Sequence, residues 1–183
     1  MRNIILNLAT TFDGMIEGPN GELDWMWINN GGQEDESKSI VDKVIELADS
    51  CDTILLGRKM TPVFIDYWEN VVDNQPDSPE YPLAKLMVNL RKIVFSHTQT
   101  DIKGRNLEVE NGDLATVVQA LKEQPGKDII VYGGAGFVSS LISQNLIDEY
   151  FIIINPVAIG RGMPIFEERC AEGYSAFLNL SKL

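Results

Sequence analysis

The stretch IIVYGGAGF, residues 129–137, places a short apolar strand directly before a glycine-rich turn that opens a helix. Glycines let a backbone approach a ligand closely, and a helix N-terminus favours an anion such as phosphate. The dinucleotide pattern GxGxxG is not met, because Ser139 stands where the third glycine would be if the pattern began at Gly134. A phosphate site and a tight turn without a ligand therefore both remain open for this stretch alone.

Two further strand ends carry side chains that suit a phosphate. The apolar run 53–56 is followed by GRK at 57–59, and the run 92–95 is followed by SHT at 96–98. Each segment alone also fits an ordinary solvated loop. Because the carboxyl ends of parallel strands lie at one edge of a sheet, the coincidence of three such ends favours a nucleotide-sized ligand.

The rest of the chain alternates strands with helices, and its middle strands are continuous apolar runs. This order is typical of an α/β protein whose sheet is covered by helices on both faces. Strands are predicted over 4–9, 53–56, 92–95, 107–109, 129–132, 150–154 and 175–180. Helices are predicted over 34–50, 61–68, 83–90, 114–122 (capped by Asp113) and 137–144, with loops over 25–33 and 71–80.

Length and composition limit the possible functions. The 183 residues suit one domain, and the net charge of -12 disfavours a nucleic-acid-binding protein. No apolar run is long enough for a membrane helix, and the first residues do not form a signal peptide, so we expect a cytoplasmic protein. One histidine and two scattered cysteines, Cys51 and Cys170, indicate neither a metal site nor a disulfide framework.

A few side chains outside the strand ends are candidates for chemistry. Asp13 follows the first predicted strand, where it fits a general acid, a substrate-binding group or a simple Asp-Gly turn. Asp24 is the second candidate acid. Trp25 and Trp27 have the shape to stack on a flat ring, although tryptophan more often fills a core.

These motifs, in this order, resemble the dihydrofolate-reductase fold family. The chain is most similar to the reductase domain of the bifunctional riboflavin-biosynthesis deaminase/reductase and to its single-domain relatives. The resemblance spans most of the sequence and includes a fairly specific tail. Its segments are 7–18, 54–59, 92–96, 130–137 and 146–166.

The resemblance implies a dihydrofolate-reductase-like α/β fold with a mostly parallel central sheet, and an NADPH-dependent reductase. The adenosine and its 2′-phosphate would be held by Gly57, Arg58, Lys59, Ser96 and His97. The pyrophosphate would be held by Gly133, Gly134, Ala135, Gly136, Phe137 and Val138. Backbone groups of Ala9 and Ile16 would flank the nicotinamide carboxamide. Asp13 matches the acid of the family's Ser-x-Asp-Gly-like segment, although Thr11 replaces the serine.

The substrate side departs from both kinds of enzyme. Dihydrofolate reductase has an acid five residues after its Pro-Trp tryptophan, where this chain has Asn30, and Asp24 replaces the proline before Trp25. The arginine of the riboflavin enzyme falls on Glu34, although Trp27 matches the segment before it. We predict a substrate site at Asp24, Trp25 and Trp27 for a small pterin- or aminopyrimidine-like heterocycle. The alternative is a non-catalytic nucleotide-binding or sensor module on the same fold.

The resemblance also bears on assembly and on the end of the chain. The apolar segments 151–154 and 160–166 suit packing against a second copy, so we expect a possible homodimer. Members of the family usually close the sheet with a terminal β-hairpin, and the predicted strand over 175–180 would be its first half.

Overall fold

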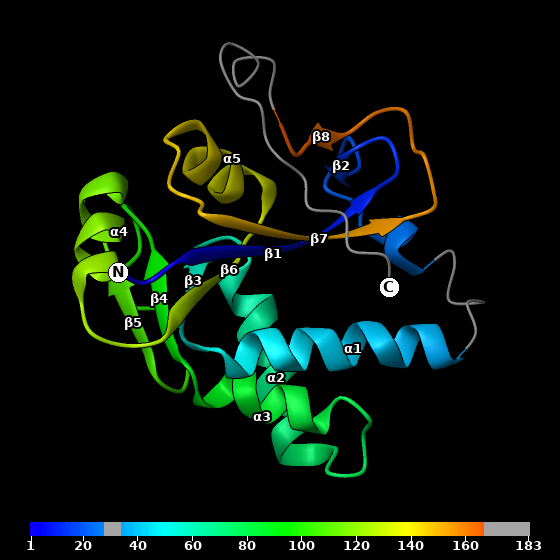
Figure 1. Cartoon of the computed structure of the whole chain (residues 1–183), viewed down its shortest axis with the longest axis horizontal. Coiled ribbons are helices and arrows are strands. Elements are labelled where there is room, and N and C mark those ends of the chain that lie inside the picture. Colours follow the sequence, from blue (N-terminus) through cyan, green and yellow to red (C-terminus); the bar gives the residue numbers. More distant parts are fainter. Residues whose placement is uncertain (28–33, 167–183) are drawn as a thin grey trace.

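The computed structural model describes residues 1–27 and 34–166, and its centre is a six-stranded sheet in the order β5-β4-β3-β6-β1-β7 (Figure 1). Every neighbouring pair of these strands runs parallel. The strands are β1 (Ile4–Thr11), β3 (Cys51–Gly57), β4 (Arg91–Phe95), β5 (Leu107–Glu110), β6 (Asp128–Tyr132) and β7 (Glu149–Asn155). The helices are α1 (Glu34–Asp49), α2 (Thr61–Asn74), α3 (Tyr81–Asn89), α4 (Leu114–Glu123) and α5 (Ala135–Ser143).

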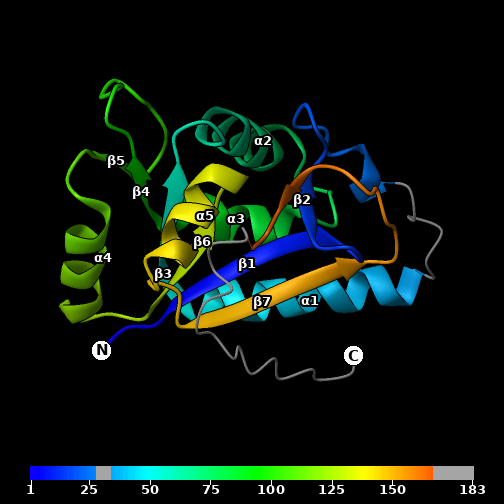
Figure 2. The ribbon, with the colours of Figure 1, turned by 90° about the horizontal axis from the view of Figure 1, so that it is seen from above.

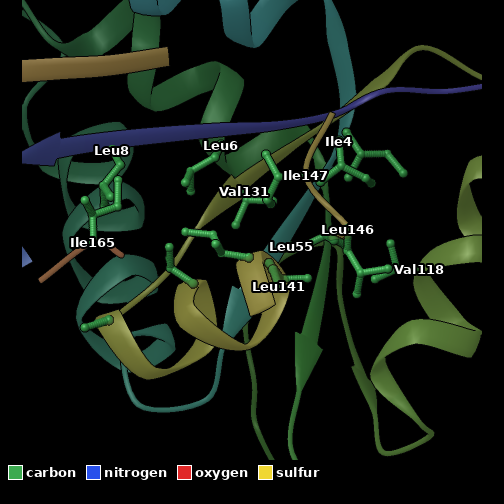
Figure 3. Packing of buried hydrophobic residues seen from close by; sticks show 14 of the residues in the cluster. Ile4, Leu6, Leu8, Leu55, Val118, Val131, Leu141, Leu146, Ile147 and Ile165 are labelled. Carbon is green, nitrogen blue, oxygen red and sulfur yellow. The ribbon is translucent and has the colours of Figure 1, made fainter. Parts of the chain in front are cut away.

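The helices cover both faces of the sheet, as predicted. Side chains alternate along a strand, so Ile4, Leu6 and Leu8 of β1 point to one face while Ile5 points to the other. The first face packs against α4 and α5, and Figure 3 shows its close-packed aliphatic core. The second face packs against α1, α2 and α3. β1 and β7 run side by side along their whole length (Figure 2). The predicted α/β fold is therefore confirmed.

Several element boundaries differ from the predictions. The loop predicted over 71–80 is wrong in its first part, because α2 continues to Asn74. Val71 is fully buried at helical spacing from Phe64 and Trp68, so the apolar stripe of this helix is one turn longer than predicted. α5 starts at Ala135, two residues before its predicted start. The predicted loop over 25–33 begins as a 3-10 helix, Asp24–Trp27, and its remainder lies outside the described residues.

A small second sheet was not predicted. β2 (Met15–Glu17) pairs antiparallel with β8 (Met163–Pro164), and the Ile165 N–H donates to the Gly14 carbonyl. Ile16 and Ile165 are buried in the same core cluster as the inward side chains of α5. We call this two-stranded unit the β2–β8 ribbon. It brings a segment near the start of the chain beside α5 and next to the last described residues (Figure 1).

None of the helices in the described parts of the chain is long and apolar enough to span a bilayer. The predicted strand over 175–180 lies outside the described residues.

Candidate functional site

The topology of the sheet indicates where a ligand would bind. After β1 the chain passes to α1 on one face, and after β6 it passes to α5 on the opposite face. Since β1 and β6 are neighbours, their carboxyl ends form the switch point at which open α/β sheets bind ligands. The β1–β6 ladder ends at Leu6 and Val131, whereas β1 continues beside β7 to Thr11.

The three predicted strand ends do lie together at this edge. β4, β3 and β6 are consecutive strands, with Gly57 paired with Phe95 and Leu56 paired with Tyr132. The segments 57–59, 96–98 and 133–138 therefore leave the sheet side by side. This confirms the predicted arrangement, from which a nucleotide-sized ligand was inferred.

Two of the glycines at this edge are explained by a single aromatic ring. A Cβ atom added to Gly57 would come within 2.7 Å of the Phe137 Cβ, and one added to Gly133 would come within 2.8 Å of Phe137 Cδ1. The Phe137 ring also packs against Phe95, with ring centroids 5.5 Å apart. Gly57 and Gly133 thus serve the packing of α5 onto the strand ends, whatever else binds there.

The other two glycines, Gly134 and Gly136, have no such close contact among the described residues. A Cβ atom added to Gly136 would meet no described atom within 4 Å, and one added to Gly134 would meet only Glu17 Oε1, at 3.6 Å. Neither residue has a positive φ that would require glycine. Glycine in a helix costs about 1 kcal/mol relative to alanine. The open space in front of the first turn of α5 therefore fits a ligand that approaches the backbone closely.

A carboxylate already contacts this helix end. The Ala135 N–H donates to Glu17 Oε1 at 3.2 Å. The first N–H groups of a helix have no intrahelical acceptor and attract negative charge. The turn thus behaves as an anion site in this structure, with a side chain of the protein as its anion. Glu17 was not singled out from the sequence, because it lies far along the chain from α5 and in no recognisable motif.

The predicted adenosine side is assembled from two neighbouring loops. Arg58 Nη1 donates to Gln99 Oε1 at 3.1 Å, which joins the loop after β3 to the loop after β4. Ser96 is buried, and its Oγ accepts the Gln99 N–H at 2.9 Å, so this hydroxyl shapes the loop. Lys59 and His97 are exposed at the same edge. Arg58, Lys59 and His97 thus lie on the neighbouring loops that follow β3 and β4, and their role toward the adenosine stays a prediction.

Asp13 has contacts that differ from those of a typical general acid. Its carboxylate accepts hydrogen bonds from Thr11 Oγ1 at 2.6 Å and from the backbone N–H groups of Gly160 at 2.7 Å and Ile159 at 3.3 Å. These bonds, led by that from Thr11, lower the pKa of Asp13, whereas a general acid needs a raised one. Asp13 thereby ties the β1–β2 turn to the loop before β8.

The predicted nicotinamide neighbours, Ala9 and Ile16, lie in β1 and in the β2–β8 ribbon. Ala9 is half-buried in β1, beyond the last residue that pairs with β6. The Ile16 side chain is buried in the core with Ile165, so backbone groups are what it can offer to a ligand. Both residues flank the switch point, one from β1 and the other from the β2–β8 ribbon.

One polar pair at the switch point was missed by the sequence reasoning. Asn7 Nδ2 donates to the Tyr132 hydroxyl at 2.8 Å, just beyond the end of the β1–β6 ladder. The pair lies on the α1 face, and burial raises the pKa of the Tyr132 hydroxyl above its usual range. A polar residue at Asn7 inside an otherwise apolar strand was the available signal in the sequence.

The predicted substrate residues are only partly described. Trp25 is buried, and its indole N–H has no hydrogen-bond acceptor among the described residues. Asp24 is exposed, and its Oδ1 accepts the Trp25 backbone N–H at 3.0 Å. The side chain of Trp27 lies outside the described part of the structure.

A hollow of about 570 Å³ lies at the other edge of the sheet, near the amino ends of β4 and β5. It is lined by the paired charges of Arg91 and Glu108 together with Asn106. Because α/β sheets bind ligands at their carboxyl edge, we place the candidate site at the switch point and not in this hollow.

Comparison with known proteins shows the family and the fold of the chain. The chain is 39% identical over 166 residues to the uncharacterized protein YyaP of Bacillus subtilis, an alignment that covers 90% of this chain and 80% of YyaP. Two solved structures share the fold. A putative riboflavin biosynthesis protein from Shewanella sp. PV-4 has a TM-score of 0.62 and 23% identity, covering 92% of this chain and 84% of that one. Enterococcus faecalis dihydrofolate reductase, solved with NADP(H), has a TM-score of 0.51 and 16% identity, in an alignment that covers 90% of this chain and 77% of the reductase. The RibD C-terminal domain family matches residues 2–180, and the chain belongs to that family.

Proposed function

We propose that the chain is an NADPH-dependent reductase that transfers a hydride to a small pterin- or aminopyrimidine-like heterocycle. Family membership supports a reductase, and the dihydrofolate reductase that shares the fold was solved with NADP(H). The observation that carries the proposal is the pair Gly134 and Gly136. Gly136 faces space that is free of described atoms, and Gly134 faces only the Glu17 carboxylate, at a helix N-terminus by the switch point of the sheet.

The residues at the carboxyl edge fit the parts of this cofactor. The segment 133–138, which includes the start of α5, would hold the pyrophosphate through backbone N–H groups such as those of Ala135 and Gly136, because the Phe137 and Val138 N–H groups donate to the Gly134 carbonyl. Arg58 and Lys59 would face the 2′-phosphate with their positive charges, and His97 would donate a hydrogen bond to it. Backbone groups of Ala9 and Ile16 would position the carboxamide at the gap between β1 and the β2–β8 ribbon.

NADPH, when bound, supplies the hydride, and the protein orients the two reactants and holds the proton that the product needs. Asp24, Trp25 and Trp27 remain our proposed substrate side. Asp13 remains the candidate proton donor from the family resemblance, although its lowered pKa and its contacts favour a role in holding the 159–160 loop. Substitution Asp13→Asn separates the two roles, since loss of a general acid lowers turnover by roughly 10²–10⁴-fold.

Thermal unfolding with NADPH and, in parallel, with NADH tests the cofactor. A ligand at 100 times its Kd stabilises the folded state by about 2.7 kcal/mol, which for a domain of this size raises Tm by roughly 5–11 °C. A clear rise with NADPH and a smaller one with NADH supports the proposal. No rise with either refutes it.

Turnover is tested next, by following NADPH oxidation with a panel of pterins and aminopyrimidines. Oxidation with any member of the panel supports the reductase. Tight binding of NADPH without turnover across the panel would favour the non-catalytic nucleotide-binding module.

A further inference from the structure

The contact between Glu17 and α5 bears on how the cofactor binds. Glu17 Oε1 lies 3.2 Å from the Ala135 N–H and 3.6 Å from the place that a Cβ on Gly134 would occupy. This is the first turn of the helix, where free N–H groups and the helix dipole favour one anion. The proposed position of the pyrophosphate is the same place.

The backbone of Glu17 is firmly held, so only its side chain is free to leave. Glu17 pairs with Met163 in the β2–β8 ribbon. Gly162 packs so closely that an added Cβ would come within 2.1 Å of the Glu17 carbonyl oxygen. A rotation of the Glu17 side chain would clear the helix end, whereas a shift of its backbone would require the ribbon to separate.

We propose that Glu17 is an internal competitor of the cofactor's pyrophosphate. This inference rests on the proposed function. The same N–H group cannot serve both anions, and two negative charges in contact repel each other. Dinucleotide binding therefore requires the Glu17 side chain to turn away from α5. The affinity for the dinucleotide is then lower than it would be if no carboxylate contacted the turn.

The test is the substitution Glu17→Gln, which removes the charge and keeps the size of the side chain. Glu22→Gln is the matched control, because Glu22 is an exposed carboxylate of the same segment whose partners are the Asn20 backbone and side chain, away from α5. Each protein is titrated by calorimetry with NADPH and with adenosine 2′-monophosphate. The second ligand carries the 2′-phosphate but has no pyrophosphate.

We expect Glu17→Gln to tighten NADPH binding on the order of tenfold, and to leave the affinity for adenosine 2′-monophosphate within about twofold of wild type. Without ligand, the same variant should melt about 1–4 °C lower, because the helix end loses its anion. Glu22→Gln should change neither affinity by more than about twofold.

The outcomes separate this inference from the proposed function. If wild type binds NADPH and Glu17→Gln binds it equally well or more weakly, Glu17 is not a competitor and only this inference is overturned. If neither protein binds NADPH, the proposed function fails and the inference with it. If Glu17→Gln alone binds, the competition is stronger than tenfold and the inference stands.

Discussion

Substitution of Gly136 by alanine should have opposite effects on stability and on cofactor binding. The added methyl group meets no described atom within 4 Å, so it clashes with no described part of the free protein. Gly136 is in the first turn of α5, where alanine is preferred to glycine by roughly 0.5–1 kcal/mol. For a domain of this size that gain corresponds to a rise in Tm of about 1–4 °C.

The same methyl group would occupy the space in which the pyrophosphate is proposed to approach the backbone. Overpacking of a close-fitted contact costs about 1–3 kcal/mol, so the affinity for NADPH should fall about tenfold or more. Scanning calorimetry measures the first effect and isothermal titration with NADPH the second. A variant that melts higher and binds more weakly cannot owe its weaker binding to misfolding.

Ser140→Ala is the matched control for this experiment. Ser140 lies one turn further along α5, where its hydroxyl donates to the Gly136 carbonyl at 2.8 Å. Its substitution removes that bond and also raises helix propensity, but it adds no atom in front of Gly136. Its affinity for NADPH should stay near that of wild type. If Gly136→Ala lowers Tm, the space is not open, and if it leaves the affinity unchanged, the pyrophosphate does not bind at this turn.

Three further results are expected. Gly57→Ala should lower Tm by roughly 2–12 °C, because its methyl group would strike the Cβ of Phe137; an unchanged Tm in scanning calorimetry would contradict this packing role. Burial lowers the pKa of Lys92 to about 8, so between pH 8 and 10.5 the unfolded chain binds more protons than the folded one. As pH rises through that range, the free energy of unfolding of wild type should increase by up to about 3 kcal/mol relative to that of Lys92→Met, as measured by urea unfolding. The pKa of Asp13 is lowered, so its contribution to stability is present above about pH 4 and lost below it. The Tm of Asp13→Asn should therefore fall less than that of wild type as the pH is lowered through this range. If the two Tm values fall in parallel, Asp13 does not hold the Gly160 loop in this way.

The order of elements could be predicted from local patterns. The apolar run 129–132 and the glycines after it form β6 and the start of α5, because such runs are buried strands wherever helices cover both faces of a sheet. Asp113 was predicted to cap α4, and its side chain accepts the Thr116 N–H at 3.0 Å. In these cases the residues that decide the structure are neighbours in the sequence.

The separate roles of the glycines could not be predicted in this way. Gly133 and Gly134 are adjacent and identical in sequence, yet one lies under the Phe137 ring and the other has only the Glu17 carboxylate in front of it. That difference arises because α5 packs against the ends of the strands and places the Phe137 ring over only one of the two glycines. Only a three-dimensional arrangement distinguishes a glycine needed for packing from one that leaves room for a ligand.

The contacts of the two acids, Asp13 and Glu17, could not be predicted from the sequence either. Asp13 could be found because it stands directly after a strand, but its partners at 159–160 come from the far end of the described chain and change what its carboxylate does. Glu17 touches α5 only because the β2–β8 ribbon places it there. Sequence spacing carries no signal for contacts of this kind.

The position of β1 in the sheet has a consequence for synthesis of the protein. β1 is an interior strand, with β6 on one side and β7 on the other, and Ile4 pairs with Ile129 while Leu8 pairs with Ile152. During translation β1 is made well before either of its partner strands, because β6 and β7 follow far later in the sequence. Such non-local pairing slows folding, because the closure of long loops precedes any contact that stabilises them. The apolar run 4–6 is therefore unprotected until late in synthesis, and a nascent chain that stops before residue 128 has no place for it in the sheet.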